Sequence, residues 1–212
     1  DVVPIHIAAG ATIDEIATLL EESGICSATD FQRAANLTTY DISLIKNIEA
    51  PEGRRYILEG YVLPGTYQIK RDSSATNVMQ ERFVSEYTAS LSQMADQSGY
   101  TLDQILTLAS VVQSECAVSS DYSTFASMLL NRIRSGKESL SYWSMPFTVL
   151  YAQHRTEDEL TSVSEADQQY DSPYNTYLYQ GFPPGPVCNP SLDAIRAVLY
   201  PEDTEYLYYE ID

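Results

Sequence analysis

The chain has 212 residues, of which 44% are hydrophobic, and this is enough to bury the core of one or two domains. Its 30 acidic and 12 basic residues give a net charge of −18, and the basic residues are scattered along the chain. No basic stripe can neutralise phosphates, so the composition excludes nucleic acid and electrostatic binding to anionic lipid. The three cysteines show no CxxC spacing and there are two histidines, so we predict neither a metal nor a redox cofactor.

No apolar run approaches the ~20 residues that a membrane-spanning helix needs, and no signal peptide is visible. The chain begins with Asp1 and not with Met. We therefore expect a soluble piece of a longer protein, in which an anchor can lie outside these residues.

The first fifty residues predict a small α+β unit. A strand over residues 2–7 is followed by a turn and by a helix that Thr12 and Glu15 can cap. Gly24 ends this helix, and a second helix begins near Thr29. Residues 50–55 are polar and favour turns, so we place a connector there and predict domains over residues 1–54 and 55–212.

Seven further segments carry a recognisable pattern. Three helices are predicted, over residues 74–98, 101–119 and 121–135. Residues 56–69 predict strand, turn and strand, and residues 206–211 predict a final strand. We expect residues 139–152 to be extended and residues 173–190 to form a short β-like segment with a rigid loop. Asn189 and Pro190 suit the N-cap and first position of one more short helix. Residues 156–159 read as a solvated charged face.

The helix predicted over residues 101–119 carries one acid near its end, Glu115. Its apolar residues recur at three- and four-residue steps, and Glu115 falls at the edge of that stripe. A carboxyl half-withdrawn from water has a raised pKa, which suits a general acid near neutral pH. The alternative is an ordinary solvated glutamate near a helix end.

Several segments, in this order, resemble the endolytic murein transglycosylase family, also called MltG or YceG-like. The segments that carry the resemblance are VVPIHIAAGATIDEIATLLEESGI, LEGYVLPGTY, LASVVQSEC, LLNRI, PFTVLYA, SPYNTYLYQGFPPGPVCNP and YLYY. They run from residue 2 to about residue 209, and YNTY with GFPPGP before NP is the most specific of them.

The resemblance implies an α+β fold with a small LysM-like N-terminal module and a YceG-like catalytic domain. It implies an enzyme on the extracytoplasmic face of the cell membrane, held by a single-pass anchor, that cuts peptidoglycan glycan strands internally. Cell-wall synthases are possible partners by the same resemblance, and membrane contact is expected only through the anchor. The family's catalytic glutamate falls on Glu115.

One carboxyl suffices for this chemistry because the C6 hydroxyl of N-acetylmuramic acid is the nucleophile. Glu115 is expected to protonate the glycosidic oxygen and then to take the proton of the C6 hydroxyl, which leaves a 1,6-anhydro sugar. The motifs carry over seven candidate substrate-binding residues: Asn131, Thr148, Tyr174, Asn175, Thr176, Tyr177 and Gly185. For each, the alternative is a purely structural role.

The chain departs from the family pattern at several positions. An aspartate before LYA is lost and Met145 stands in its place, which puts turnover in doubt. Gln113 replaces the first acid of the EKE-type triplet and, at about 200° from Glu115, is expected to point away from it. Trp143 is interpreted as a sugar platform or a core residue, and Cys116 and Cys188 could form a disulfide.

Two other functions remain open at this point. A family member that has lost the aspartate could bind glycan or act as a scaffold with little turnover. A lyase of chorismate-type metabolites would be expected to carry a pyridoxal-phosphate lysine in a phosphate-cradling loop, and none is found.

Overall fold

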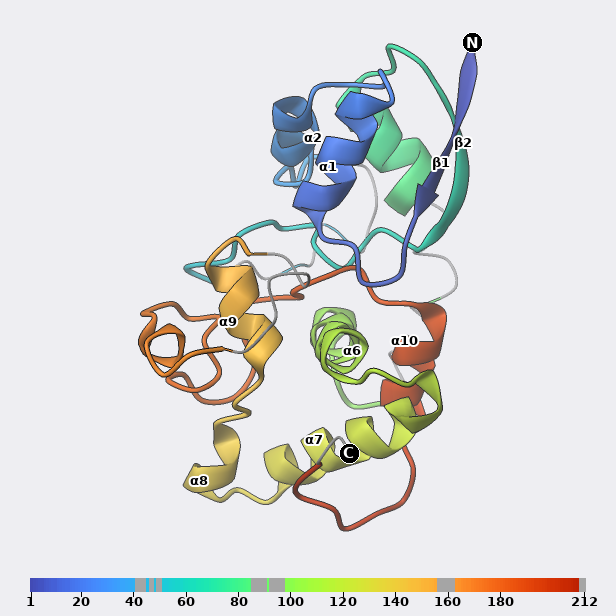
Figure 1. Cartoon of the computed structure of the whole chain (residues 1–212). Helices are drawn as coiled ribbons and strands as arrows, with labels where there is room; N and C mark the ends of the chain where they lie inside the picture. Colours follow the sequence, from blue (N-terminus) through green and yellow to red (C-terminus); the bar gives the residue numbers. More distant parts are fainter. Residues whose placement is uncertain are drawn as a thin grey trace.

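The structure is a computed structural model, and it describes residues 1–40, 45, 48, 51–84, 91, 98–155 and 163–209. Figure 1 shows two groups of elements, one above the other. The upper group contains a two-stranded sheet with helices α1 and α2, and the lower group contains helices α6 to α10. The predicted α+β class is confirmed, whereas the likeness of the upper group to a LysM module stays a prediction.

The sheet of the upper group joins β1 (Val2–Ile7) to β2 (Gly65–Lys70) in antiparallel register, from Val2 opposite Lys70 to Ile7 opposite Gly65. Ile5, Ile7 and Ile69 are buried in the core. Because β2 follows the connector, this pairing joins residues from both sides of the predicted boundary at residues 54 and 55. The boundary itself stays a prediction.

Helix α1 (Ile13–Glu22) packs beside β1, and α2 (Ala28–Ala34) packs against α1. The predicted capping box is confirmed, because the Thr12 side chain accepts from the Glu15 N–H and the Glu15 side chain accepts from the Thr12 N–H. The second helix begins slightly earlier than predicted, because Ser27 is its N-cap.

The helix predicted over residues 74–98 is described only in its first part. It consists of α4 (Ala75–Asn77) and a π-helical segment over Val78–Val84. Phe83 in that segment makes edge-to-face contacts with Phe31 and Tyr67, at centroid distances of 5.9 and 4.9 Å. Residues 85–90 and 92–97 of the prediction lie outside the described residues.

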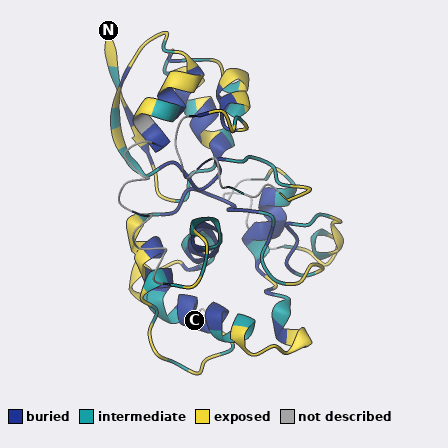
Figure 2. Ribbon diagram, turned by 180° about the vertical axis from the view of Figure 1, so that it is seen from behind, coloured by how far each residue is buried: buried dark blue, intermediate teal, exposed yellow. Residues whose placement is uncertain are grey.

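Helix α6 (Leu102–Glu115) is the centre of the lower group, and it contacts α7 (Tyr122–Arg134), α9 (Pro146–Ala152) and α10 (Leu192–Leu199). All eight residues from Ile105 to Val112 are buried, and Figure 2 shows α6 as a buried core element. The predicted Thr101–Gln104 capping box is present. The α6 and α7 predictions are confirmed, except that α6 ends at Glu115 because Cys116 is extended (φ −100°, ψ 110°).

The prediction of an extended segment over residues 139–152 is wrong. The structure has α8 (Glu138–Ser141) and α9 there, joined by residues 142–145. Pro146 occupies the first turn of α9, where its missing N–H costs nothing, and burial of the apolar residues overrides their β propensity.

Three other strand predictions are also wrong. Within the described residues, 56–63, 173–177 and 206–209 form no strand. The backbone groups of these segments form hydrogen bonds within turns or with side chains of neighbouring elements. The last helix begins at Leu192 with Ser191 as N-cap, because the Asn189 side chain bonds elsewhere. Residues 156–162, with the predicted charged face, and 210–212 lie outside the described residues.

Within the described residues, no helix combines the length and the apolar character that crossing a bilayer requires.

Candidate active site

Glu115 is the last residue of α6, and its side chain is half-buried. Its Oε1 accepts a hydrogen bond of 2.6 Å from the backbone N–H of Phe147. Phe147 follows Pro146 in the first turn of α9, so this N–H has no acceptor within its own helix. The bond fixes the carboxyl at the junction of α6 and α9.

A cavity of ≈ 320 Å³ opens beside the Glu115 side chain. Its lining comes from the β1–α1 turn, the end of α6, the start of α7 and the start of α9: Ala9, Gly10, Gln113, Ser114, Glu115, Cys116, Ala117, Tyr122 and Phe147. A partly buried carboxyl therefore faces a recess that can receive a ligand. Gln113 lines the same cavity, but its side chain bonds Tyr122 and Ser191 whereas Glu115 bonds Phe147 of α9, as expected for side chains that leave α6 in different directions.

Gln113 holds two neighbouring elements at the cavity. Its Nε2 donates to the Tyr122 hydroxyl at 2.8 Å, and its Oε1 accepts from the backbone N–H of Ser191 at 3.0 Å. These bonds tie α6 to the starts of α7 and α10. Glu115, two positions further along α6, bonds α9 instead, so the two side chains serve different neighbours of the cavity.

The opposite wall of the cavity is the turn Ala8–Ala11. Gly10 adopts φ +86°, a conformation that glycine takes at least cost, and its N–H donates to the Asn189 carbonyl at 2.9 Å. Asn189 in turn donates to the Ala11 carbonyl from its backbone N–H and from its Nδ2, each at 2.9 Å. The wall is thus fixed by one residue of the loop that precedes α10.

Among the predicted binding residues, Tyr177 shows the clearest electrostatic link to Glu115. Burial and, secondarily, the Glu115 carboxylate raise the pKa of Tyr177 above its ordinary value. The side chain is half-buried and is not among those that line the cavity beside Glu115. Its contact with a sugar stays a prediction.

Thr148 and Thr176 form a buried hydroxyl pair behind the start of α9. The two Oγ1 atoms are 2.9 Å apart, Thr148 also donates to the Met145 carbonyl at 2.6 Å, and Thr176 accepts from the Met145 N–H at 2.9 Å. Their exposed fractions are 0 and 1%. These contacts support the start of α9 and leave the hydroxyls no direct access to a ligand.

Tyr174 and Asn175 organise the loop before residue 180. The Asn175 Nδ2 donates to the carbonyls of Gln168 and Tyr170, at 3.0 and 2.8 Å, and its Oδ1 accepts from the Tyr177 N–H. Tyr174 is buried and makes an edge-to-face contact with Tyr151. Asn175 therefore holds the backbone of Tyr177, and Tyr174 anchors the same loop to α9.

Asn131 and Gly185 lie at structural contacts. Asn131 donates from Nδ2 to the carbonyls of Thr204 and Tyr206, which fastens the C-terminal segment to α7. A side chain at Gly185 would place its Cβ 2.8 Å from the Arg54 Cζ, so only glycine lets the guanidinium pack there. The substrate role predicted for both residues stays a prediction.

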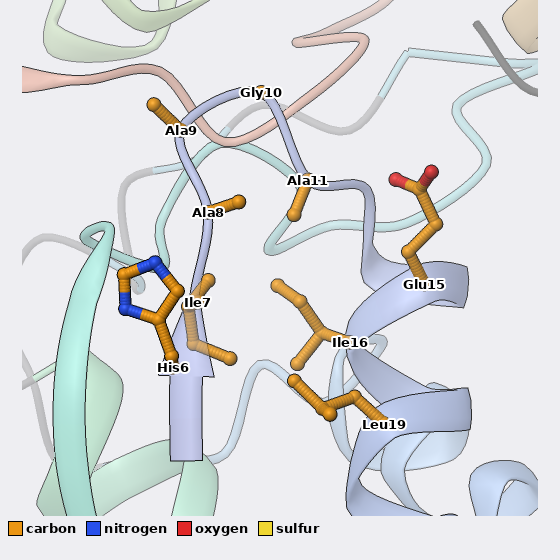
Figure 3. Close-up of a pocket in the computed structure, with 9 residues that line it drawn as sticks. All are labelled: His6, Ile7, Ala8, Ala9, Gly10, Ala11, Glu15, Ile16 and Leu19. Carbon is orange, nitrogen blue, oxygen red and sulfur yellow. The ribbon is translucent and has the colours of Figure 1, made fainter. Parts of the chain in front are cut away.

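A second cavity, of ≈ 310 Å³, lies on the other side of the same turn (Figure 3). Figure 3 shows Ile7, Ile16 and Leu19 along it, with His6 and Glu15 at its two sides. Ala9 and Gly10 line both this cavity and the one beside Glu115. The turn Ala8–Ala11 therefore separates two neighbouring recesses.

Sequence reasoning missed Glu59, which is fully buried and accepts hydrogen bonds from three elements. Burial raises its pKa from the ordinary value of 4.5 to about 8. The available signal was an acid inside the apolar run from Tyr56 to Leu63, within the LEGY motif.

Three further expectations can be compared with the structure. Cys116 and Cys188 are free, so the disulfide between them is not present. Trp143 is 1% exposed and packs on Phe182, which makes it a core residue and not a sugar platform. Met145, in place of the family's aspartate, is the N-cap residue of α9 and offers no side-chain acceptor to that helix.

Across the described part of the chain, no three His, Cys, Asp or Glu side chains gather closely enough to hold a metal ion.

Comparisons with known proteins agree with this arrangement. The model of the YceG-like family matches residues 1–212. Over 168 residues the chain is 32% identical to the endolytic murein transglycosylase of Streptococcus pneumoniae serotype 2, strain D39, covering 76% of this chain and 29% of that protein. Over 167 residues it is 32% identical to the protein of that name in Bacillus subtilis strain 168, covering 77% of this chain and 43% of the relative.

A crystal structure of a putative yceG-like protein from Listeria monocytogenes matches with a TM-score of 0.85 and 27% identity, covering 99% of this chain and 69% of that one. The chain thus spans less than half the length of the two named relatives and most of the fold of the solved one. A family model that matches from the first residue to the last, with the fold that a solved member shares, shows that this chain belongs to the YceG-like family.

Proposed function

We propose that this chain is the glycan-cleaving part of an endolytic peptidoglycan lytic transglycosylase, with Glu115 as its single acid and base. The observation that carries the proposal is a half-buried carboxyl beside a cavity, at the position that the family resemblance assigns to the catalytic glutamate. The names of the relatives support the same reaction class.

The proposed reaction begins with Glu115 protonated. The acid gives its proton to the oxygen of the bond between N-acetylmuramic acid and N-acetylglucosamine as that bond breaks. The carboxylate then takes the proton of the C6 hydroxyl as the hydroxyl oxygen bonds to C1. The products are a free sugar hydroxyl and a 1,6-anhydro end, and Glu115 returns to its starting state without consuming water.

The hydrogen bond from the Phe147 N–H has a defined part in this cycle. It stabilises the carboxylate that exists between the two proton transfers. It also fixes the direction of the carboxyl, so that the second oxygen can face the cavity. The Glu115 charge raises the pKa of Tyr177, and we propose that Tyr177 contacts the sugar at the cleavage point.

The second cavity is proposed to hold the glycan strand beyond the cleavage point. It shares Ala9 and Gly10 with the cavity beside Glu115, so a strand that leaves one cavity can continue into the other. Residues 1–54 would then grip glycan as a LysM-like module, and residues 55–212 would cut it. A site on the extracytoplasmic face of the cell membrane, an anchor outside these residues and contact with cell-wall synthases complete the proposal by family resemblance.

The experiment compares the chain with its Glu115→Gln variant on purified glycan strands. The native chain should release fragments with anhydro ends, and the variant should release at least a hundredfold less while it still binds the strands. Glu22→Gln, which changes an exposed acid, serves as the control and should keep full activity. Equal release by all three proteins would refute the proposal.

A glycan-binding module with little turnover is the second candidate. Met145 gives α9 no side-chain cap, and Glu115 supplies an acceptor in its place, which ties the carboxyl to a structural contact. If this candidate is right, the same experiment will show binding by all three proteins and anhydro ends at background level.

A further inference from the structure

Glu59 is a buried carboxyl that the proposed chemistry does not use. It lies in the turn after Tyr56 with an exposed fraction of 0%. Three donors from three different segments reach it: the backbone N–H of Ile13 at the start of α1, the Tyr151 hydroxyl of α9 and the Asn189 Nδ2. A buried acid without a structural task would be costly, because burial disfavours its charge.

The first connection from Glu59 to the active site runs through α9. The Tyr151 hydroxyl donates to the Glu59 Oε2 at 3.0 Å, near the C-terminal end of this short helix. At the opposite end, the Phe147 N–H donates to the Glu115 Oε1 at 2.6 Å. Helix α9 is therefore held between two carboxyl groups, and a shift at one end moves the donor at the other.

The second connection runs through Asn189 to the turn Ala8–Ala11. Asn189 donates from Nδ2 to the Glu59 Oε1 at 2.9 Å and to the Ala11 carbonyl at 2.9 Å. Its own carbonyl accepts from the Gly10 N–H at 2.9 Å. Glu59 thereby helps to set the position of Gly10, which lines the cavity beside Glu115.

We infer that Glu59 is a positioning residue for the proposed reaction, which places the Phe147 N–H and the Gly10 wall on two sides of the Glu115 carboxyl. The inference rests on the proposed function for its kinetic consequence. When ionised, Glu59 accepts from all three donors through its two oxygens, whereas glutamine would turn an NH₂ group toward at least one of them. Loss of the acceptor should therefore disturb the chemical step more than glycan binding.

The test measures kcat and KM on glycan strands for Glu59→Gln and Tyr151→Phe. Glu59→Gln should lower kcat about tenfold with KM changed less than twofold, the loss of an interaction made in the transition state. Tyr151→Phe removes only the α9 contact and should lower kcat in the same direction. The double variant should be no slower than Glu59→Gln alone, because both changes remove the same contact between Glu59 and the Tyr151 hydroxyl.

Ile25→Val and Ile25→Ala are the controls, since Ile25 is buried, lines no part of the cavity beside Glu115 and is not one of the three donors to Glu59. Ile25→Val should lower Tm a little, Ile25→Ala should lower it more, and neither should change kcat. The inference is wrong if Glu59→Gln lowers kcat no more than an Ile25 variant of equal Tm. It is also wrong if the fold losses in kcat of Glu59→Gln and Tyr151→Phe multiply in the double variant. If Glu59→Gln does not fold, Tyr151→Phe decides the matter by the same comparison.

The amide resonance of Phe147 in a ¹⁵N-labelled sample separates this inference from the proposed function. Its proton should move upfield in Glu115→Gln, which identifies the charged hydrogen bond, and should also move in Glu59→Gln but not in Ile25→Val. A native chain that produces no anhydro ends would overturn the proposed function alone. An amide that responds to Glu115→Gln and not to Glu59→Gln would overturn the positioning role.

Discussion

Glu59 and Glu115 are both withdrawn from solvent, but their surroundings give them different tasks. Glu59 is fully enclosed and surrounded by donors, so a substrate cannot reach it. Glu115 is half-buried at the end of α6, with a cavity on one side and one backbone donor on the other. Access to a ligand, and not the extent of burial, separates the candidate acid from the structural one.

The raised pKa of Glu59 predicts how stability depends on pH. Its ordinary value is 4.5 and its folded value is about 8, because burial outweighs the bonds from Tyr151 and Ile13; Asp14 raises the pKa further and Arg55 lowers it. Between these values the folded chain keeps a proton that the unfolded chain releases. This contribution to stability is therefore present below pH 4.5 and is lost as the pH rises to about 8.

Urea unfolding from pH 5 to pH 8.5 checks this prediction. The stability of the native chain relative to Glu59→Gln should fall steadily over that range. Two parallel profiles would mean that Glu59 titrates alike in the folded and unfolded chains.

At the scale of elements, α9 depends on a cap from another helix. Its N-cap residue, Met145, provides no acceptor, and the Glu115 carboxyl accepts from the second N–H of the helix instead. Glu115→Ala should therefore cost about 1 kcal/mol of unfolding free energy, as loss of a helix cap does. Glu115→Gln keeps an acceptor oxygen and should cost clearly less.

Urea midpoints of the two Glu115 variants check the capping role without any glycan. The comparison is informative because both variants remove the charge and only one removes the acceptor. If they are equally stable, the contact with Phe147 does not cap α9.

The turn Ala8–Ala11 is the element that both cavities share. Ala9 is exposed and lines both recesses, so Ala9→Trp can fold and still place a ring where glycan is proposed to cross. KM for glycan strands should rise about tenfold, equivalent to ~1.4 kcal/mol of binding, with kcat nearly unchanged. Val2→Trp, on an exposed residue of β1, is the control, and an equal KM for the two variants would place the glycan elsewhere.

At the scale of the whole molecule, Arg54 joins the connector to the lower group. Its guanidinium is 1% exposed and makes two bonds to the Asp103 carboxylate of α6, at 2.8 and 2.9 Å. It also packs against Gly185 of the loop before α10. A buried ion pair of this kind ties three distant segments together.

Asp103→Ala removes the carboxylate that neutralises this buried cation, and it should lower the unfolding free energy by about 3 kcal/mol. Asp193→Ala is the matched control, because the Asp193–Arg196 pair is exposed and should contribute less than ~1 kcal/mol. Chemical unfolding at pH 7 measures both. Similar losses in the two variants would show that the Arg54 pair is not a main tie between the segments.

Periodicity and capping residues predicted the helices whose signals are local. Thr12 with Glu15, and Thr101 with Gln104, mark the starts of α1 and α6 within a few residues of chain. The same periodicity placed Glu115 near the end of its helix, although the predicted helix ran on to residue 119. These predictions succeeded because the interactions that decide them join residues three or four positions apart.

The sequence by itself determined the α+β class, the capped helices and the one acid at the end of α6. Only the tertiary structure decided that α9 is a helix, that Gln113 faces the same recess as Glu115, and that Glu59 is enclosed by Ile13, Tyr151 and Asn189. The physical reason is distance along the chain. The donors that reach Glu59 are 46, 92 and 130 residues away from it, and no local pattern encodes a contact that exists only after the elements have packed.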